Sequence, residues 1–276
     1  MPRTALAAAT TFYVSTTGNN ANDGLTALTA WETLQGAWQN MQGGYDFAGN
    51  VVTVQLANGI YRGGLNATGP ILGLSGAGSL IFKGDMTNNN NVIVSPWLGN
   101  PFAAAYGAMY SIHGIAMDSA GVAPTPHNPN GGADLISVGQ FSAVRIKQVT
   151  FHNGVGNGHM AVAFGGNITI DQPGYTIIGG GQYHITAGAG GTIYYDTDGI
   201  TGLITIQNSH MPTFTAGFAC ANGCAVINAQ GLSFTGGAYG PTYLAKNNGI
   251  IDTRNGNPNY FPGMIAGTVA SGGQYN

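Results

Sequence analysis

The sequence contains one close pair of carboxylates that could support acid–base chemistry. Asp196 and Asp198 lie in the segment Asp-Thr-Asp-Gly at residues 196–199. If this segment continues the strand before it, both carboxylates point the same way and lie close together. Their repulsion would raise the pKa of one of them, as the general acid of a glycoside hydrolase requires. The alternative is turn chemistry, since Asp-x-Asp-Gly is also an ordinary turn sequence.

Metal and nucleotide chemistry find little support in the sequence. An EF-hand loop would place its glycine later than Gly199 and a Glu where Gln207 stands. The six histidines show no zinc-ligand spacing. The glycine run at residues 179–181 lacks the Lys and Ser or Thr that follow in a phosphate-binding loop. We therefore expect neither a metal nor a cofactor.

Tyrosines near strand ends are candidates for glycan binding. Their rings supply flat faces for sugar stacking, and their hydroxyl groups supply hydrogen-bond partners. The candidates are Tyr194, Tyr195, Tyr239, Tyr243 and Tyr260. The alternative is that half of each neighbouring pair faces the core, and that Tyr260 with Phe261 closes one end of the fold.

The two cysteines, Cys220 and Cys224, are separated by three residues. A disulfide across one turn is one interpretation. Half of a metal site is another, but no second cysteine pair or suitably spaced histidine supports it. The remaining alternative is that both thiols face inward and pack as small apolar groups.

The elements that must position these residues are short β-type runs between residues 144 and 234. Apolar and polar residues alternate in each run, and Asn, Asp and Gly occupy the breaks. The runs are residues 144–151, 168–170, 192–195, 203–206 and 232–234. No amphipathic helical pattern separates them, which excludes an ordinary layered α/β fold. A β-solenoid and an antiparallel sandwich or barrel remain.

The spacing of the runs favours the solenoid. Phe151 to Ile170 spans about one short coil and Ile170 to Ile193 about one longer coil, in line with repeat periods of roughly twenty-odd residues. A solenoid also needs only turns between its strands. We therefore predict an all-β fold built as a parallel solenoid.

The composition indicates a folded chain with few charges. Of 276 residues, 47 are Gly, 43% are hydrophobic and only 6% are charged. Aromatic and β-branched residues gather in runs, which argues against disorder. Because so few charged groups are available to solubilise the surface, we expect part of it to face a partner subunit.

Charge and hydropathy exclude two classes of partner. The net charge is −3 and the seven cations are scattered along the sequence, so we expect no nucleic acid. No apolar run is long enough to cross a bilayer, so we expect no membrane insertion. The alanine stretch at residues 5–8 is too brief for a signal peptide, and release by cell lysis is the expected route out of the cell.

The N-terminal part resembles the opening of right-handed parallel β-helix proteins. The resemblance lies in the strand ending Tyr13-Val14-Ser15, the Asn-, Asp- and Gly-rich loop after it, and residues 30–37, Ala-Trp-Glu-Thr-Leu-Gln-Gly-Ala. It implies a short helix that caps the first coil. The spacing agrees, because apolar residues recur at helical intervals and would cover an apolar end: Leu34, Ala37, Trp38 and Met41.

The C-terminal part resembles the end of phage and prophage tail-fibre or virion β-helix proteins. The matching segments are residues 214–221, 232–243, 247–253 and 260–275, the last with the pattern Pro-Gly-x-x-Ala-Gly followed by Gly-Gly-x-Tyr. The resemblance implies a homotrimer that joins other virion proteins and contacts polysaccharide on the host surface. It also implies that the protein belongs to the virion and acts outside the host cell.

These observations predict a right-handed parallel β-helix with a short N-terminal capping helix. We expect three segments: residues 1–49 form an arm and capping segment, residues 50–240 form the β-helix, and residues 241–276 close it. Within the first segment, we expect residues 1–11 to be flexible. The expected function is that of a virion structural protein, in a tail fibre, tail spike or capsid-attached fibre, adhering to host-surface glycan. The alternatives are a polysaccharide depolymerase of the same fold and a purely structural capsid decoration protein.

Overall fold

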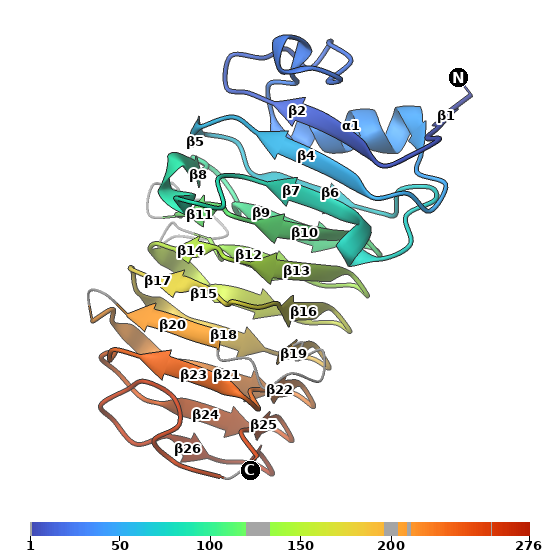
Figure 1. Cartoon of the computed structure of the whole chain (residues 1–276). Helices are drawn as coiled ribbons and strands as arrows, with labels where there is room; N and C mark the ends of the chain where they lie inside the picture. The colour runs from blue at the N-terminus through green and yellow to red at the C-terminus, as the bar shows by residue number, and fades with distance from the viewer. Residues whose placement is uncertain (1, 120–132, 196–203, 209–210, 255) are drawn as a thin grey trace.

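The computed structural model describes residues 2–119, 133–195, 204–208, 211–254 and 256–276. These residues form three large parallel sheets, one small two-stranded sheet and one α-helix (Figure 1). Three short 3-10 segments, η1 (Ala27–Thr29), η2 (Ala77–Ser79) and η3 (Asn89–Asn91), lie in the connections. The fold is therefore all-β in character.

The strands of the ten-stranded sheet are β2 (Thr10–Val14), β4 (Val52–Leu56), β7 (Leu80–Lys83), β10 (Met109–His113), β13 (Ala143–Lys147), β16 (Asn167–Ile170), β19 (Thr192–Tyr195), β22 (Val226–Asn228), β25 (Ile250–Asp252) and β27 (Gln274–Tyr275). Those of the seven-stranded sheet are β5 (Gly59–Tyr61), β8 (Val92–Val94), β11 (Ala116–Met117), β14 (Thr150–Phe151), β17 (Thr176–Ile177), β20 (Ile204–Asn208) and β23 (Leu232–Thr235). Those of the eight-stranded sheet are β6 (Leu65–Thr68), β9 (Phe102–Ala105), β12 (Ile136–Val138), β15 (Gly154–Val162), β18 (Gly181–Ala187), β21 (Phe214–Asn222), β24 (Tyr243–Lys246) and β26 (Thr268–Val269).

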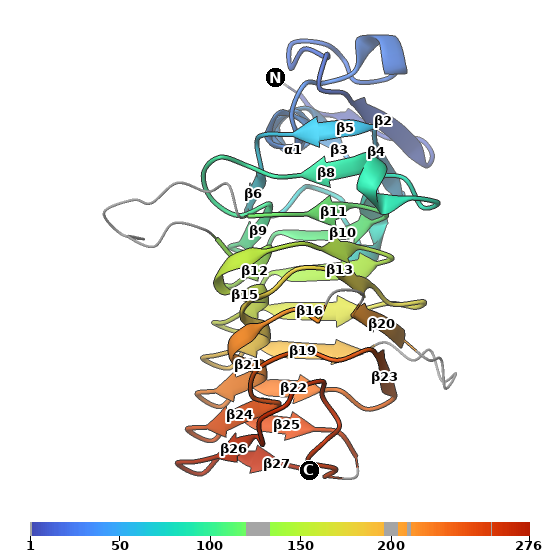
Figure 2. The ribbon, with the colours of Figure 1, turned by 90° about the vertical axis from the view of Figure 1, so that its left-hand side faces the viewer.

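The chain visits the three large sheets in turn, and we call one such passage a coil. Within each sheet, successive strands lie side by side in chain order, so the coils are stacked from β2 to β27 (Figure 2). Every strand pairing in the described part is parallel, for example β13 with β16. The antiparallel sandwich or barrel is therefore wrong. Parallel strands joined in this order are consistent with a β-helix.

The paired residues give the length of a coil. Ala143 pairs with Asn167, and Asn167 pairs with Thr192, so these two coils contain 24 and 25 residues. The expected repeat of roughly twenty-odd residues is confirmed for these two coils. The specific equivalence of Phe151 with Ile170 is wrong, since the two residues belong to different sheets.

The core consists of columns of apolar side chains that stack from coil to coil. In the ten-stranded sheet one column is formed by buried residues that are paired in successive strands: Val54, Phe82, Ile112, Ile146 and Ile170. The residues on either side of each point outward, as period-two alternation predicts. Burying each such side chain stabilises the fold by about 1.5–3 kcal/mol. The shared columns hold each coil in register with the next.

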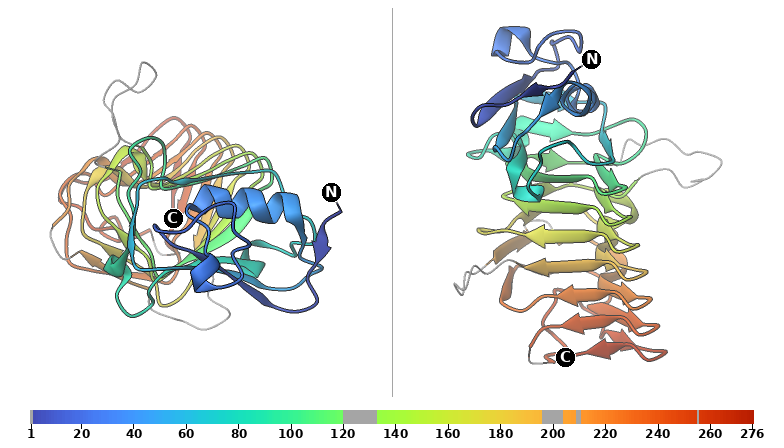
Figure 3. Two further views of the ribbon diagram at one scale, coloured as in Figure 1. Left: turned by 90° about the horizontal axis from the view of Figure 1, so that it is seen from above. Right: turned by 90° about the vertical axis from the view of Figure 1, so that its right-hand side faces the viewer.

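The helix α1 (Leu34–Gly44) lies at the N-terminal end of the stack, across the coils when seen from above (Figure 3). It begins at Thr33, whose side-chain hydroxyl accepts a hydrogen bond from the Gly36 backbone N–H at 2.9 Å. The predicted apolar face is confirmed, because its four members, Leu34, Ala37, Trp38 and Met41, are all buried. The helix therefore covers one end of the core.

The flexible arm expected over residues 1–11 is wrong. Strand β1 (Thr4–Ala5) pairs in parallel with β3 (Tyr45–Asp46), and Thr10 already belongs to β2. The ten-stranded sheet runs from β2 to β27 and so continues through both expected boundaries, at residues 49–50 and 240–241. Of the helices in the described ranges, none has the length and apolar character needed to traverse a bilayer.

Candidate functional site

A groove of about 520 Å³ runs over the outer face of the eight-stranded sheet. Its floor is one column of small side chains paired across β9, β12, β15 and β18: Ala103, Ser137, Ala161 and Thr186. The residues beside them point inward and are buried, such as Ile136 and Val138 next to Ser137. The small outward residues leave space above the sheet over several coils.

One wall of the groove carries polar groups from Asp134, Asn157 and Tyr183. Here β15 and β18 depart from regular register, between Gly154 and Gly158 and again beside Tyr183. Such irregularities re-aim side chains. The carboxylate of Asp134 accepts a hydrogen bond from the Gly158 backbone N–H at 2.9 Å.

The electrostatics of this wall favour neutral groups. Burial raises the pKa of Asp134, against the effect of its hydrogen bonds from Gly158 and Asn157. Burial also raises the pKa of Tyr183 to about 12, so its phenol keeps its proton at neutral pH. The wall can therefore offer hydrogen-bond donors and acceptors to a polyhydroxylated ligand.

The opposite rim of the groove consists of stacked two-residue turns. In each turn both residues have positive φ: Tyr106 and Gly107, Gln140 and Phe141, and Phe164 and Gly165. The turns are joined by backbone hydrogen bonds, from the Gly107 N–H to the Gln140 carbonyl at 3.1 Å and from the Phe141 N–H to the Phe164 carbonyl at 3.2 Å. Glycine or asparagine is usual in this conformation, and aromatic residues are uncommon there.

The aromatic side chains of these turns are exposed to solvent. Tyr106 is 66% exposed, Phe141 80% and Phe164 64%, and Phe164 also lines the groove. We call these three residues the aromatic rim. Large apolar side chains that remain exposed together, on backbone positions that disfavour them, are typical of a binding surface.

Sequence reasoning missed the aromatic rim because the turns align only when the coils are stacked. The three residues are not evenly spaced in the sequence. The available signal was an aromatic residue beside Gly at the end of an alternating run, as in Tyr106-Gly107 and Phe164-Gly165. That pattern marks a left-handed turn position, where glycine is strongly favoured.

The rim predicts the effect of a substitution at Gly165, whose φ is +70°. A Cβ there would lie 2.7 Å from the ring of Phe141. Gly165→Ala is therefore expected to lower the free energy of unfolding by about 1–2 kcal/mol, measured by urea denaturation. Gly43→Ala is the control, because a Cβ in this part of α1 meets nothing within 4 Å. It should instead stabilise the fold by about 0.5–1 kcal/mol, and equal effects would contradict the rim geometry.

The structure does not gather the predicted tyrosines into one surface. Tyr195 and Tyr243 are buried, 7% and 8% exposed, so their rings present no face to a sugar, and that prediction is wrong for both. Tyr260 donates a hydrogen bond from its hydroxyl to the Leu232 carbonyl at 2.8 Å and packs against Phe261, as the end-closing alternative predicts.

The remaining candidates are separated from the groove or outside the described residues. Tyr194 is half-buried on the ten-stranded sheet, paired with Thr169. Tyr239 is 48% exposed but does not line the groove. Asp196 and Asp198 lie outside the described residues, and no structural role is assigned to them.

The two cysteines are free, so the predicted disulfide is wrong. Cys220 is buried at one end of the groove, and burial raises the pKa of its thiol. Cys224 is exposed, in a left-handed turn with φ of 59°. The alternative of two inward-packed thiols is also wrong, because Cys224 is exposed and Cys220, paired with Thr186, lies on the outward face that lines the groove.

The groove offers one carboxylate, that of Asp134, among the described residues that line it. Glycoside hydrolysis uses two. Over the described ranges, His, Cys, Asp and Glu form no group of three or more that could hold a metal ion. Comparisons with family models, curated proteins and solved structures found no match to this chain. Its function must be inferred from the groove and the aromatic rim.

Proposed function

We propose that the chain is a right-handed parallel β-helix that binds a glycan in the groove of the eight-stranded sheet. The observation that carries this proposal is the aromatic rim. Phe164 lines the groove beside a floor of small side chains, and the exposed rings of Phe141 and Tyr106 belong to the turns stacked on it. Apolar ring faces suit the C–H faces of sugars, and the surrounding hydroxyl and amide groups suit sugar hydroxyls.

The shape of the site favours an extended ligand. The floor crosses four strands, β9, β12, β15 and β18. With about 4.8 Å between neighbouring strands, this is a length of roughly 14 Å. Hydroxyl groups of Ser137, Thr186 and Tyr183 lie along it. An oligosaccharide segment therefore fits the groove better than a single sugar does.

We further propose that the protein is a trimeric virion component, in a tail fibre, tail spike or capsid-attached fibre, that adheres to host-surface polysaccharide. The C-terminal sequence resemblance supports this setting. The surface supports oligomerisation, because large apolar side chains outside the groove lining are exposed, including Leu28 and Met264. A stable monomer in sedimentation would contradict the trimer.

The binding proposal predicts that Phe141→Ala and Phe164→Ala each weaken glycan binding about tenfold, the equivalent of about 1.4 kcal/mol for a lost stacking face. Affinity electrophoresis with a panel of capsular and O-antigen polysaccharides measures it. Trp97→Ala is the matched control, since Trp97 is 64% exposed but belongs neither to the groove lining nor to the turns of the aromatic rim. Unchanged binding in both phenylalanine variants would exclude the groove as the site.

A depolymerase is the second candidate, and Asp134 is the observation that favours it. Its carboxyl faces the groove and burial raises its pKa, as a general acid requires. The second carboxylate of a hydrolase would then come from a neighbouring subunit. The unaltered chain would be established as a depolymerase if it releases reducing ends from the polysaccharide and the Asp134→Asn variant does not. Binding without cleavage would favour a virion protein that adheres to glycan but does not cleave it. No binding at all would favour a structural decoration protein.

A further inference from the structure

The outer face of the ten-stranded sheet gathers three of the chain's seven cations. His113 in β10 is paired with Lys83 of β7 on one side and with Lys147 of β13 on the other. We call these three residues the basic ladder. With strands about 4.8 Å apart, the backbones at Lys83 and Lys147 are separated by roughly 10 Å. Arg145 lies on the same face of β13. These cations are scattered along the sequence, but the pairing of β7, β10 and β13 brings them to one face of the sheet.

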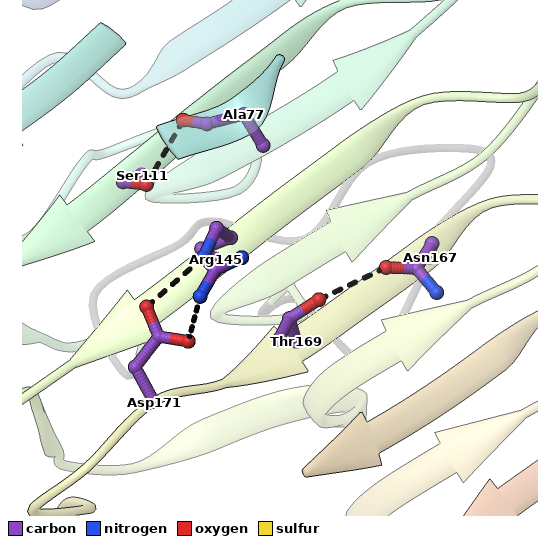
Figure 4. A network of polar contacts seen from close by, with 6 residues as sticks. All are labelled: Ala77, Ser111, Arg145, Asn167, Thr169 and Asp171. Atoms are coloured by element: carbon purple, nitrogen blue, oxygen red, sulfur yellow. Dashed lines mark hydrogen bonds and ion pairs between the residues drawn. The ribbon is translucent and has the colours of Figure 1, made fainter. Parts of the chain in front are cut away.

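The charge of the ladder comes from its two lysines. Burial lowers the pKa of His113 to about 4, with smaller contributions from Lys147, Lys83 and Arg145, so His113 is neutral at pH 7. The guanidinium of Arg145 donates hydrogen bonds to the carboxylate of Asp171 at 2.7 and 3.0 Å (Figure 4). Within the described residues, neither Lys83 nor Lys147 has an ion pair or a side-chain hydrogen bond.

Two connections bound the ladder. On one side η2 packs on the sheet, where the Ser111 hydroxyl donates a hydrogen bond to the Ala77 carbonyl at 2.9 Å (Figure 4). On the other side the side-chain amide of Asn89, in η3, donates to the Gln148 carbonyl. The outward residues paired with Lys83 and Arg145 are polar, Gln55 and Thr169 (Figure 4), whereas Ile81 lies two residues before Lys83 on the same face of β7. The ladder is thus a mainly polar strip along the stack of coils.

Unneutralised like charges on one sheet face repel each other and destabilise it. A chain with only seven cations places two of them here, and no described residue forms an ion pair with either. We propose that the basic ladder binds the anionic groups of an acidic polysaccharide lying along the stack of coils. The proposal does not rest on the groove, which lies on a different sheet.

The surroundings favour this ligand over two others. A protein partner would need an apolar centre to its interface, and the strip is polar. Duplex nucleic acid is bound through many phosphate contacts, often about six to ten, for which two free lysines are too few. A polyhydroxylated polyanion matches both the lysines and the polar side chains between them.

The test uses polygalacturonate and dextran sulfate, with neutral dextran as the uncharged probe. The full chain is expected to bind at least one of the two polyanions. Lys83→Gln/Lys147→Gln should weaken that binding at least tenfold and reduce the slope of log affinity against log salt by about two. Arg3→Gln/Arg254→Gln, with the same change in net charge, should bind as the unaltered chain does.

Three results would overturn the proposal: no binding of either polyanion, equal binding by the ladder variant and its control, or tighter binding of duplex DNA than of both polyanions. Lys83→Arg/Lys147→Arg should retain binding, which separates loss of charge from loss of folding. Phe141→Ala and Phe164→Ala should also leave polyanion binding unchanged. The experiments therefore distinguish failure of the proposed glycan binding in the groove from failure of the proposed polyanion binding at the basic ladder.

Discussion

Acidification from about pH 6.5 to about pH 4 is expected to lower the free energy of unfolding by several kcal/mol, because two histidines are buried in neutral form. His159 in β15 and His184 in β18 are both fully buried, among aromatic rings that include Phe151 and Phe214. A charge placed there would lose its hydration without gaining an opposite charge.

The hydrogen bonds of this pair define its neutral state. The Nδ1 atoms of the two histidines are 2.9 Å apart, His184 Nε2 is 2.7 Å from the Tyr175 hydroxyl, and His159 Nε2 is 3.1 Å from the Gly180 carbonyl. A carbonyl only accepts, so His159 carries its proton on Nε2. His184 then donates from Nδ1, and the Tyr175 hydroxyl donates to His184 Nε2. Every polar atom is satisfied with both rings neutral.

The sign of the effect follows from the pKa shifts. Burial lowers the pKa of His159 to about 4 and that of His184 well below its ordinary value of 6.5. Below about pH 6.5 the unfolded chain binds protons that the folded chain does not, so stability falls as the pH falls. For His159 alone the loss approaches about 3 kcal/mol. Asp134, whose pKa burial raises, offsets part of this loss.

Urea denaturation at a series of pH values measures this loss, and a flat profile between pH 6.5 and 4 would contradict it. The control variant His159→Leu/His184→Leu/Tyr175→Phe removes the polar atoms of the network, so its stability should depend less on pH in this window. Should that variant fail to fold, NMR titration of the unaltered chain gives the same answer. Neither imidazole should gain a proton in the folded state above about pH 5.

Trp38→Ala is expected to lower the free energy of unfolding by about 3–5 kcal/mol, the range for an aromatic side chain removed from a core. Trp38 lies on the buried face of α1, 1% exposed, and its ring lies edge-on to Tyr110 of β10, with ring centroids 6.1 Å apart. The substitution would leave a cavity between the helix and the end of the stack. The urea midpoint of the purified variant measures the loss.

Trp38→Phe is the matched control. The indole Nε1–H is buried without a hydrogen-bond partner among the described residues, and such an unpaired donor destabilises the fold by about 1–3 kcal/mol. Phenylalanine keeps most of the ring and removes the donor, so its loss should be well below that of alanine. A Trp38→Ala variant as stable as the unaltered chain would mean that α1 does not close the core.

Local patterns in the sequence determined the inward faces of strands and the helix. They did not determine every strand end, because the run at residues 144–151 is divided at Gln148, with φ of 48°, into β13 and β14, which belong to different sheets. Val144 and Ile146 alternate with Arg145 and Lys147 and are buried, as the alternation in the run at residues 144–151 predicted. The spacing of Leu34, Ala37, Trp38 and Met41 likewise predicted the buried face of α1. These properties were predictable because the periods of strand and helix are set by backbone geometry within a few residues.

Only the tertiary structure decided which residues share a column, because the coils differ in length. His113 follows its partner Lys83 by 30 residues, and Lys147 follows His113 by 34. Cations that are scattered along the sequence therefore meet on one face. The aromatic rim arises in the same way, since its turns align only through hydrogen bonds between coils. Alternation predicts that a side chain lies on one of two faces, but the stacking of unequal coils determines its neighbours.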